Sequence, residues 1–137
     1  KAIQQAGLDS RIIADSAGTH NYHVGEPPDP RAQQAVRRRG ADISSLRGRQ
    51  VCERDFVEFD YILVMDSHNY QALIERAPRE HHGKIRKLLS FSRKYPHLDV
   101  PDPYYGGPQG FESNLDMIED AVKHLLAEIE RNARTRA

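Results

Sequence analysis

The sequence has a single cysteine, Cys52, among its 137 residues. One thiol cannot form an internal disulfide, and no cluster of cysteine, histidine and acidic residues shows the spacing of a zinc site. The adjacent His81 and His82 lie in a polar stretch, which is more typical of a solvated loop than of a metal centre. We therefore expect no metal and no other cofactor.

An excess of charge of either sign is also missing. Twenty Lys and Arg residues balance twenty Asp and Glu residues, so the net charge gives no reason to expect a nucleic acid or an anionic membrane as partner. The apolar run at residues 61–65 is far shorter than the roughly 20 residues of a membrane-spanning helix. The first residues lack the apolar core of a signal peptide. These absences predict a soluble cytoplasmic protein, and the length predicts one domain over residues 1–137.

Short apolar runs alternate with helical patterns, which is typical of the α/β class. The patterns predict strands at residues 11–16, 61–65 and 84–89. They predict a first helix that ends near Ala6, before Gly7, and a second that runs from Pro30 to about Arg39, with Asp29 as its cap and Gly40 as its stop. A third helix is predicted at residues 53–59, and a fourth runs from a cap at Asp66 or Ser67 to a residue before Pro78. A last helix of about twenty residues or more carries an apolar stripe of Phe111, Leu115, Ile118, Val122, Leu125 and Ile129. Strands joined by helices should form a parallel sheet with its chemistry at the carboxyl ends of the strands.

One carboxylate, Asp102, lies between Pro101 and Pro103 and is followed by Tyr104 and Tyr105. The prolines restrict the backbone around the acid, and the tyrosines offer flat apolar surface beside it. This arrangement suits an acid that must protonate an aromatic leaving group. A Pro/Gly turn with exposed tyrosines explains the composition equally well.

The other candidates at strand ends are Ser16, Asp66 and Tyr22. A serine at a strand end more often satisfies loop backbone than attacks a substrate, and the sequence lacks the Gly-x-Ser-x-Gly elbow of a hydrolase nucleophile. Asp66 is most simply a helix cap. Tyr22 could line a cleft or cover the edge of the core.

Four segments, in their order and spacing, resemble the low-molecular-weight protein-tyrosine phosphatase family over essentially the whole chain. They are DSAGT (15–19), GEPPD (25–29), FDYILVMD (59–66), and DPYYG (102–106) with GFE (110–112). The resemblance implies a three-layer α/β fold, in which helices cover both faces of a twisted, parallel, four-stranded sheet.

The resemblance also implies the roles of the site residues. Asp102 would be the general acid that protonates the leaving phenolate, and Tyr22, Tyr104 and Tyr105 would form aromatic walls around the phosphotyrosine ring. Ser16 would belong to the hydrogen-bond network that supports the phosphate loop. Asp66 would either be structural or support the residues that contact the substrate. The implied substrate is a phosphotyrosine-containing protein or a small aryl phosphate, which a monomer or weak homodimer hydrolyses through a cysteinyl phosphate.

The phosphate loop of the family, C-x-x-x-x-x-R-S, is missing from this sequence. Cys52 is followed six residues later by Glu58 rather than by an arginine, so we expect Cys52 to be an ordinary half-buried thiol. In the family architecture the missing first strand would lie in the middle of the sheet, between the strands at Ile12 and Ile62, and its absence would leave both edges unpaired. We expect the nucleophilic cysteine and the phosphate-binding arginine upstream of Lys1 in a longer phosphatase, with residues 1–137 alone inactive. The alternative is a short, inactive form that acts as a phosphoprotein-binding or regulatory module.

Three further features bear on these alternatives. Leu46 stands where many family members have a histidine that hydrogen-bonds within the site. Related arsenate reductases pass a disulfide between extra cysteines, and one cysteine excludes that chemistry. The arginines at positions 37–39, 47 and 49 could bind a phosphorylated protein or nucleic acid, although a solvated helix end explains the run 37–39 more simply.

Overall fold

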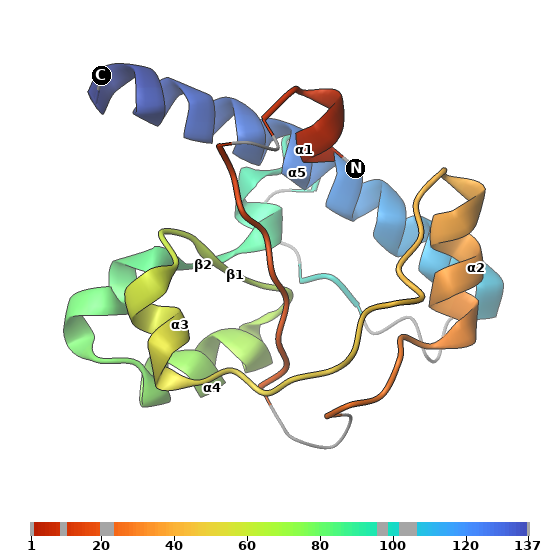
Figure 1. Cartoon of the computed structure of the whole chain (residues 1–137), viewed down its shortest axis with the longest axis horizontal. Helices are drawn as coiled ribbons and strands as arrows, with labels where there is room; N and C mark the ends of the chain where they lie inside the picture. The colour runs from red at the N-terminus through yellow and green to blue at the C-terminus, as the bar shows by residue number, and fades with distance from the viewer. Residues whose placement is uncertain (1, 9–10, 20–23, 96–98, 102–106, 137) are drawn as a thin grey trace.

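The computed structural model describes residues 2–8, 11–19, 24–95, 99–101 and 107–136 (Figure 1). Within these ranges the elements are, in chain order, α1 (Ala2–Gln5), α2 (Pro30–Arg38), α3 (Glu53–Glu58), β1 (Ile62–Val64), α4 (Ser67–Arg76), the 3-10 helix η1 (Arg79–Lys84), β2 (Ile85–Lys87), the 3-10 helix η2 (Leu88–Phe91) and α5 (Gly107–Arg136). Among the described helices, none combines the length and the apolar composition that a membrane crossing requires.

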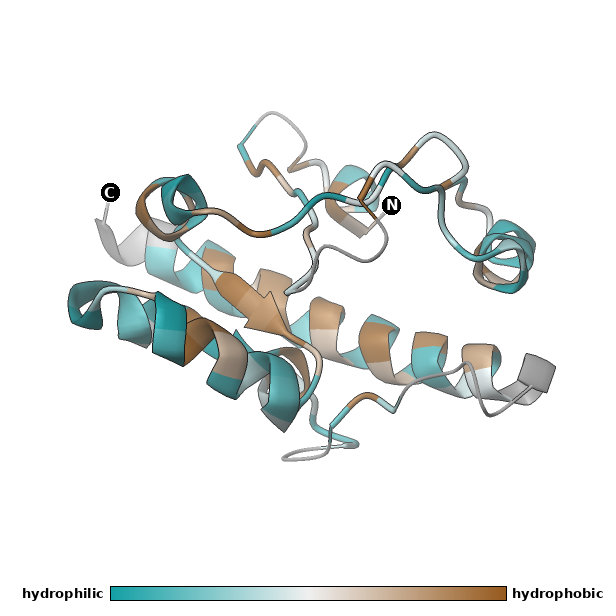
Figure 2. Ribbon diagram, turned by 90° about the horizontal axis from the view of Figure 1, so that it is seen from below, coloured by the Kyte–Doolittle hydropathy of each residue, from teal (hydrophilic) through white to brown (hydrophobic). Residues whose placement is uncertain are grey.

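The two strands pair in parallel, with Ile62 opposite Ile85 and Val64 opposite Lys87. This pairing confirms the predicted parallel sheet and the α/β class, whereas the described residues form only two of the four strands that were expected. The helix α4 connects the strands and packs against both of them, as the β-α-β pattern of the sequence predicts. Figure 2 shows the apolar strand between helical layers and the alternation of apolar and polar residues along α5.

The pleat of β1 divides its side chains between two cores. Ile62 and Val64 belong to the cluster under α4, whereas Tyr61 and Leu63 pack into the cluster under α5. The first cluster contains Val51, Phe56, Val64, Leu73, Ala77 and Ile85. The second contains Leu88, Leu89, Phe91, Val100, Ala121 and Leu125. Helices therefore cover both faces of the sheet, as predicted.

Local signals set the ends of the helices where the sequence predicts them. The Asp29 carboxylate accepts a hydrogen bond from the Arg31 backbone N–H at 2.7 Å, and Pro30 is the first residue of α2. Gly40 follows that helix with a φ of 83°, a conformation that glycine adopts without strain. Asp66 caps α4 by accepting from the Asn69 N–H at 2.7 Å. The helix α5 confirms the predicted C-terminal helix, and its apolar stripe faces the core.

The strand predicted at residues 11–16 is wrong. These residues have no regular secondary structure, and the Ile13 side chain is 87% exposed. Among the described residues no strand is hydrogen-bonded alongside them, and a strand exists only through such pairing. The strand predicted at 84–89 is shorter than expected, because the chain turns into η2 after Lys87.

The segment from residue 15 to 19 is instead attached to residues 49–51. The Gly18 N–H donates to the Arg49 carbonyl at 2.8 Å, and the Val51 N–H donates to the Gly18 carbonyl at 2.9 Å. The Arg49 guanidinium contacts Asp15 at 3.2 Å and forms a two-pronged pair with the buried Asp55 at 2.9 and 3.0 Å. This guanidinium therefore connects the 15–19 segment to the start of α3.

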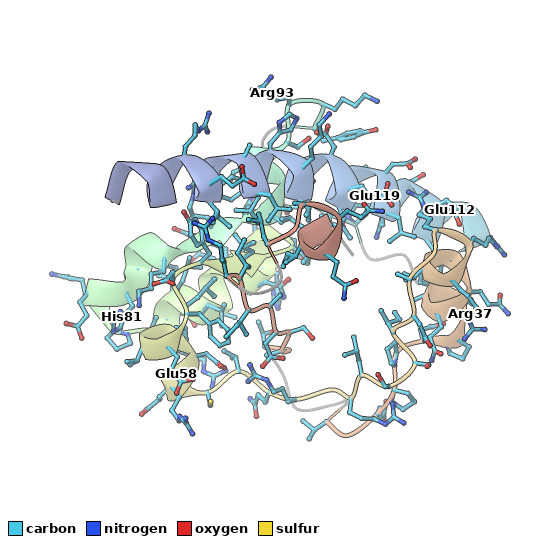
Figure 3. All side chains as sticks on the ribbon, turned by 45° about the horizontal axis from the view of Figure 1, so that its top comes forward. Arg37, Glu58, His81, Arg93, Glu112 and Glu119 are labelled. Carbon is cyan, nitrogen blue, oxygen red and sulfur yellow. The ribbon has the colours of Figure 1, made fainter. Side chains whose placement is uncertain are left out.

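A second arginine connects α2 to α5. Arg39, which follows α2, contacts Glu112 at 2.7 Å, Asp116 at 3.0 Å and Glu119 at 3.1 Å, three acids on one face of α5. Figure 3 labels Glu112 and Glu119 where α5 passes the end of α2. Two arginines of the basic set, Arg39 and Arg49, thus serve the fold itself.

We predict that Asp55→Asn lowers the free energy of unfolding by about 1–3 kcal/mol, because it breaks a charge-assisted pair with a buried carboxylate. Arg49 is the main cause that holds the pKa of Asp55 below its usual value. The contribution is therefore fully present above the unfolded-state pKa, about 4, and is lost as the pH falls through the lower folded-state pKa. Urea unfolding of the protein at pH 7 and pH 3 should show a smaller difference between wild type and variant at pH 3.

The matched control is Glu58→Gln in the same helix. Glu58 pairs with Arg54 at 2.7 Å, but both side chains are exposed, so the change should stay below about 0.5 kcal/mol. Equal losses in the two variants at pH 7 would contradict the assigned role of Asp55.

Candidate functional site

The carboxyl ends of β1 and β2 meet the segment of residues 99–101. The Val100 N–H donates to the Met65 carbonyl, one residue beyond β1, at 2.8 Å, and the Val100 side chain is buried in the second core. The sequence predicts that the loop carrying Asp102 meets the strand ends, and the two residues before Asp102 are found there. Asp102 itself lies outside the described residues, as do Tyr22, Tyr104 and Tyr105.

A polar cluster of Ser67, Lys87 and Asp99, here called the strand-end cluster, holds this segment. The Lys87 ammonium donates to the Asp99 carboxylate at 2.7 Å and to the Ser67 hydroxyl at 2.6 Å. The Ser67 backbone N–H donates to the second Asp99 oxygen at 3.1 Å. Lys87 is the main cause that holds the pKa of Asp99 below its usual value. An ionised Asp99 therefore links the loop to the ends of both strands.

The helix α5 holds the same segment from another side. The Asn114 side-chain amide donates to the Pro101 carbonyl at 2.6 Å, and Asn114 is buried. Pro101 is bonded directly to Asp102 in the chain. The two residues before Asp102, Val100 and Pro101, are thus each held by a hydrogen bond.

A hollow of about 440 Å³ lies beside these anchors, between α2, the end of β1 and α5. Most of its lining is apolar, and Asp66, Asn69 and Asn114 supply polar groups. The apolar side includes Val36, Met65, Val100, Phe111, Leu115 and Ile118. The cap residue Asp66 therefore has the structural role predicted for it and also borders the hollow.

Ser16 lies in the segment attached to residues 49–51. Its side chain is exposed, and its backbone N–H donates to the Asp15 carboxylate at 2.8 Å. The Arg49 guanidinium holds that same carboxylate. The described contacts thus fix the backbone at Ser16 through Asp15 and Arg49.

Cys52 is exposed, and the prediction of a half-buried thiol is wrong. The residue is the N-cap of α3, where its backbone N–H donates to the Asp55 carboxylate at 2.9 Å. The cap position commits its backbone to the helix end, and the side chain points to solvent rather than into the core below α3. Leu46, the residue in place of the family histidine, is 49% exposed.

The adjacent His81 and His82 each contact a nearby group of the chain. His82 lies with Nε2 2.9 Å from the Ala77 carbonyl, and His81 faces Glu80 at 3.6 Å. Within the described ranges, no three metal-ligating side chains come together.

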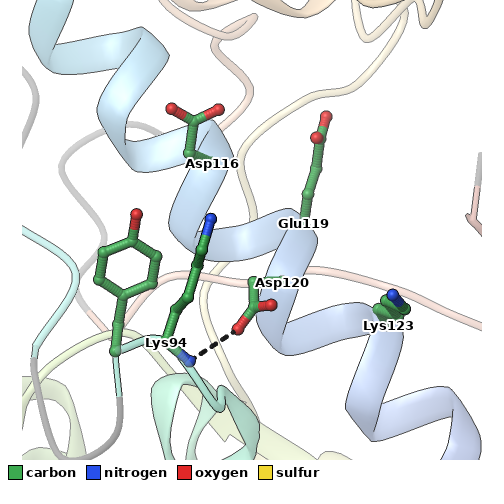
Figure 4. A pocket seen from close by; sticks show the side chains of 6 residues that line it. Lys94, Asp116, Glu119, Asp120 and Lys123 are labelled. Carbon is green, nitrogen blue, oxygen red and sulfur yellow. Dashed lines mark hydrogen bonds between the residues drawn. The ribbon is translucent and has the colours of Figure 1, made fainter.

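A second hollow, of about 420 Å³, lies on the outer side of α5 (Figure 4). Its lining is mostly charged and consists of Lys94, Tyr95, Asp116, Glu119, Asp120 and Lys123. The Asp120 carboxylate already accepts from the Ser92 hydroxyl at 2.5 Å and from the backbone N–H groups of Arg93 and Lys94 at 3.1 and 3.3 Å. These bonds hold the pKa of Asp120 below its usual value, with Ser92 as the main cause. Asp120 therefore caps a turn. Because this acid already has a structural role, we assign the candidate site to the strand ends rather than to the second hollow.

The sequence analysis missed Lys87, Asp99 and Asn114. Lys87 stood out only as a charge at the end of a weak strand, and Asp99 and Asn114 belong to no local pattern. The signal that could have found Lys87 is its position as the last residue of a parallel strand, at the same edge of the sheet where Asp66 was considered as a site residue.

Comparison with known proteins agrees with this architecture. The chain matches the family described as Low molecular weight phosphotyrosine protein phosphatase over residues 1–135. A crystal structure of a protein tyrosine phosphatase from Entamoeba histolytica superposes with a TM-score of 0.91 at 40% identity, covering 96% of this chain and 83% of that one.

Two curated bacterial relatives have the same family name. The low molecular weight protein-tyrosine-phosphatase YfkJ of Bacillus subtilis is 38% identical over 91% of this chain and 79% of its own length. The low molecular weight protein-tyrosine-phosphatase of Streptomyces coelicolor is 38% identical over 98% of this chain and 84% of its own length. These matches agree with the parallel sheet and with the 99–101 segment at the carboxyl ends of its strands, and they show that the chain belongs to the low molecular weight protein-tyrosine phosphatase family.

Proposed function

We propose that the protein hydrolyses phosphotyrosine, or a small aryl phosphate, and that Asp102 is its general acid. The observation that carries the proposal is the double anchoring of the residues before Asp102. Val100 is bonded to the end of β1 and Pro101 to α5, at the edge where parallel sheets hold their chemistry. The relatives named as tyrosine phosphatases support the same reaction.

The proposed reaction has two steps. In the first, a cysteine thiolate attacks phosphorus, the S–P bond forms, the bond from phosphorus to the phenolic oxygen breaks, and the Asp102 carboxyl gives its proton to that oxygen. In the second, water attacks phosphorus and gives a proton to the Asp102 carboxylate. The S–P bond breaks, and phosphate and the thiolate are released. Tyr22, Tyr104 and Tyr105 are proposed to contact the ring of the substrate, and Ser16 to support the phosphate loop.

The thiolate and the arginine that binds phosphate are proposed to come from residues upstream of Lys1 in the full-length gene product. The strand of that segment would pair between residues 11–16 and β1. The lack of regular secondary structure at residues 11–16 and the exposed side chain of Ile13 support this arrangement. The exposed Cys52 does not suit the nucleophile, because its backbone caps α3 and Arg54 beside it is paired with Glu58.

We predict that the full-length gene product hydrolyses p-nitrophenyl phosphate and that residues 1–137 alone do not. The physical reason is that a thiolate and an anion cradle are both required, and they are proposed to lie in the upstream segment. A steady-state assay of both forms tests this, with circular dichroism to confirm that each is folded. Turnover by residues 1–137 would contradict the placement of the nucleophile, and phosphopeptide capture without turnover by the full-length form would favour a binding module.

For Asp102→Asn in the full-length form we predict a fall in kcat of about 10²- to 10⁴-fold, the usual range for the loss of a general acid. KM should change little, because the acid acts on the leaving oxygen rather than on substrate binding. The matched control is Asp60→Asn, which removes an exposed carboxylate at the opposite end of β1. An Asp102→Asn enzyme with wild-type kcat would refute the assignment.

The strand-end cluster gives a separate prediction. Lys87→Met should lower kcat about tenfold, because the 99–101 segment loses its ionic link to the end of β2 and small displacements of a catalytic group are costly. Lys123→Met removes an exposed lysine from the outer side of α5 and should leave kcat unchanged. Stopped-flow or steady-state kinetics on the two variants would decide, and equal kcat values would remove Lys87 from the proposed site.

A further inference from the structure

The two polar atoms of the Asn114 side chain differ in their hydrogen bonding among the described residues. Its side-chain N–H₂ donates to the Pro101 carbonyl at 2.6 Å, and the residue is only 6% exposed. Its Oδ1 atom is buried and has no hydrogen-bond partner among the described residues. Asn114 lines the hollow of the candidate site, and most of the other lining residues are apolar, Phe111, Leu115 and Val100 among them.

These surroundings suit an apolar residue better than an amide. A buried acceptor that lacks a partner costs stability, whereas an aliphatic side chain of similar size would pack there without that cost. Buried polar atoms without partners are rare in native proteins and call for a specific explanation. Packing alone therefore does not explain Asn114. Among the contacts of the described residues, its hydrogen bond to Pro101 is the feature that an aliphatic residue cannot supply.

The Pro101 carbonyl controls the geometry of the next residue. Proline has no N–H, so the carbonyl is the only backbone group of Pro101 that can be held by a hydrogen bond. The carbonyl oxygen lies in the same rigid peptide plane as the nitrogen and Cα of Asp102. A donor fixed on this oxygen thus restrains the orientation of the plane from which Asp102 begins.

The helix that supplies the donor is itself held in place. Glu112 and Asp116, on either side of Asn114 in the sequence, both contact the Arg39 guanidinium that follows α2, at 2.7 and 3.0 Å. The side chain of Arg31 lies over the Phe111 ring at 5.2 Å. The amide of Asn114 therefore projects from a turn of α5 that two arginines tie to α2.

We propose that Asn114 is a positioning residue for the general acid, acting through the Pro101 carbonyl. This inference rests on the proposed function of Asp102. Asn114 itself does not touch the substrate, and its effect is to keep the carboxyl of Asp102 aimed at the leaving oxygen. Loss of the amide donor should then weaken proton transfer without weakening substrate binding or the fold.

The first test is Asn114→Leu in the full-length gene product. We expect kcat to fall about tenfold with phenyl phosphate and clearly less with p-nitrophenyl phosphate, because a more acidic phenol leaves with less help from the acid. KM should stay within about twofold, and Tm should be unchanged or higher, because the unmet acceptor is removed. A residue that is merely structural would instead lower Tm and reduce kcat equally for both substrates, and that result would overturn the proposal.

The second test, Asn114→Asp, uses a side chain of the same shape. An ionised carboxylate cannot donate to the Pro101 carbonyl, whereas a protonated carboxyl can. The ratio of variant to wild-type kcat should therefore rise as the pH falls through the pKa of the introduced carboxyl, which burial places above its usual value. A ratio that stays flat with pH would contradict the role of the donor.

The control on the same helix is Asn132→Leu, whose amide donates to the Tyr61 hydroxyl at 2.9 Å, far from Pro101. It should leave the dependence on the leaving group at the wild-type value. The Asp102→Asn enzyme separates the two hypotheses. If that substitution does not affect kcat, the proposed function fails; if it does and Asn114→Leu keeps the wild-type dependence on the leaving group, only the inference on Asn114 fails.

Discussion

The hydrogen bond from the Val100 N–H to the Met65 carbonyl is the constraint on which the site depends. It attaches a loop to the carboxyl end of β1, and β1 in turn is fixed between the two cores by the alternation of its side chains. Val100 also fills the core under α5, so the loop cannot leave the strand end without exposing apolar surface. Burial of Val100 sets the position of the loop, and the hydrogen bonds of the strand-end cluster and of Asn114 then fix the orientation of its backbone.

The parts of the fold that the sequence predicts well are those with local causes. The cap at Asp29, the proline at position 30 and the glycine at position 40 act within a few residues of each other, and α2 begins and ends accordingly. The stripe along α5 needs only the helical period. The strand at residues 11–16 was wrong because apolar, β-branched residues favour a strand only where a neighbouring strand offers hydrogen bonds, and none does within the described part of the chain.

The residues that hold the loop were missed for a related reason. Lys87 and Asp99 are twelve residues apart, and Pro101 and Asn114 are thirteen apart, and the members of each pair belong to different segments of the fold. Neither periodicity nor a cap signal links such positions. Arg39 differs, since its partners Glu112, Asp116 and Glu119 recur at helical spacing on α5, and an acidic helix face opposite a basic helix end was readable in principle. The sequence interpretation considered the arginines without their acidic partners and therefore predicted a solvated helix end. In the structure Arg39 forms ion pairs with three acids of α5.

The two supports of the loop also differ in how they respond to pH, and the proposed reaction needs that difference. A general acid must carry its proton at the start of the first step, whereas Asp99, three residues earlier, must be ionised to hold Lys87. Two carboxyl groups so close in the chain can meet opposite demands only if their surroundings separate their pKa values. Lys87 and the Ser67 backbone lower the pKa of Asp99, so this support remains charged under conditions in which a nearby acid is protonated. The bond from Asn114 to Pro101 joins two neutral groups and does not titrate, so the residue next to Asp102 stays anchored throughout the proton transfer.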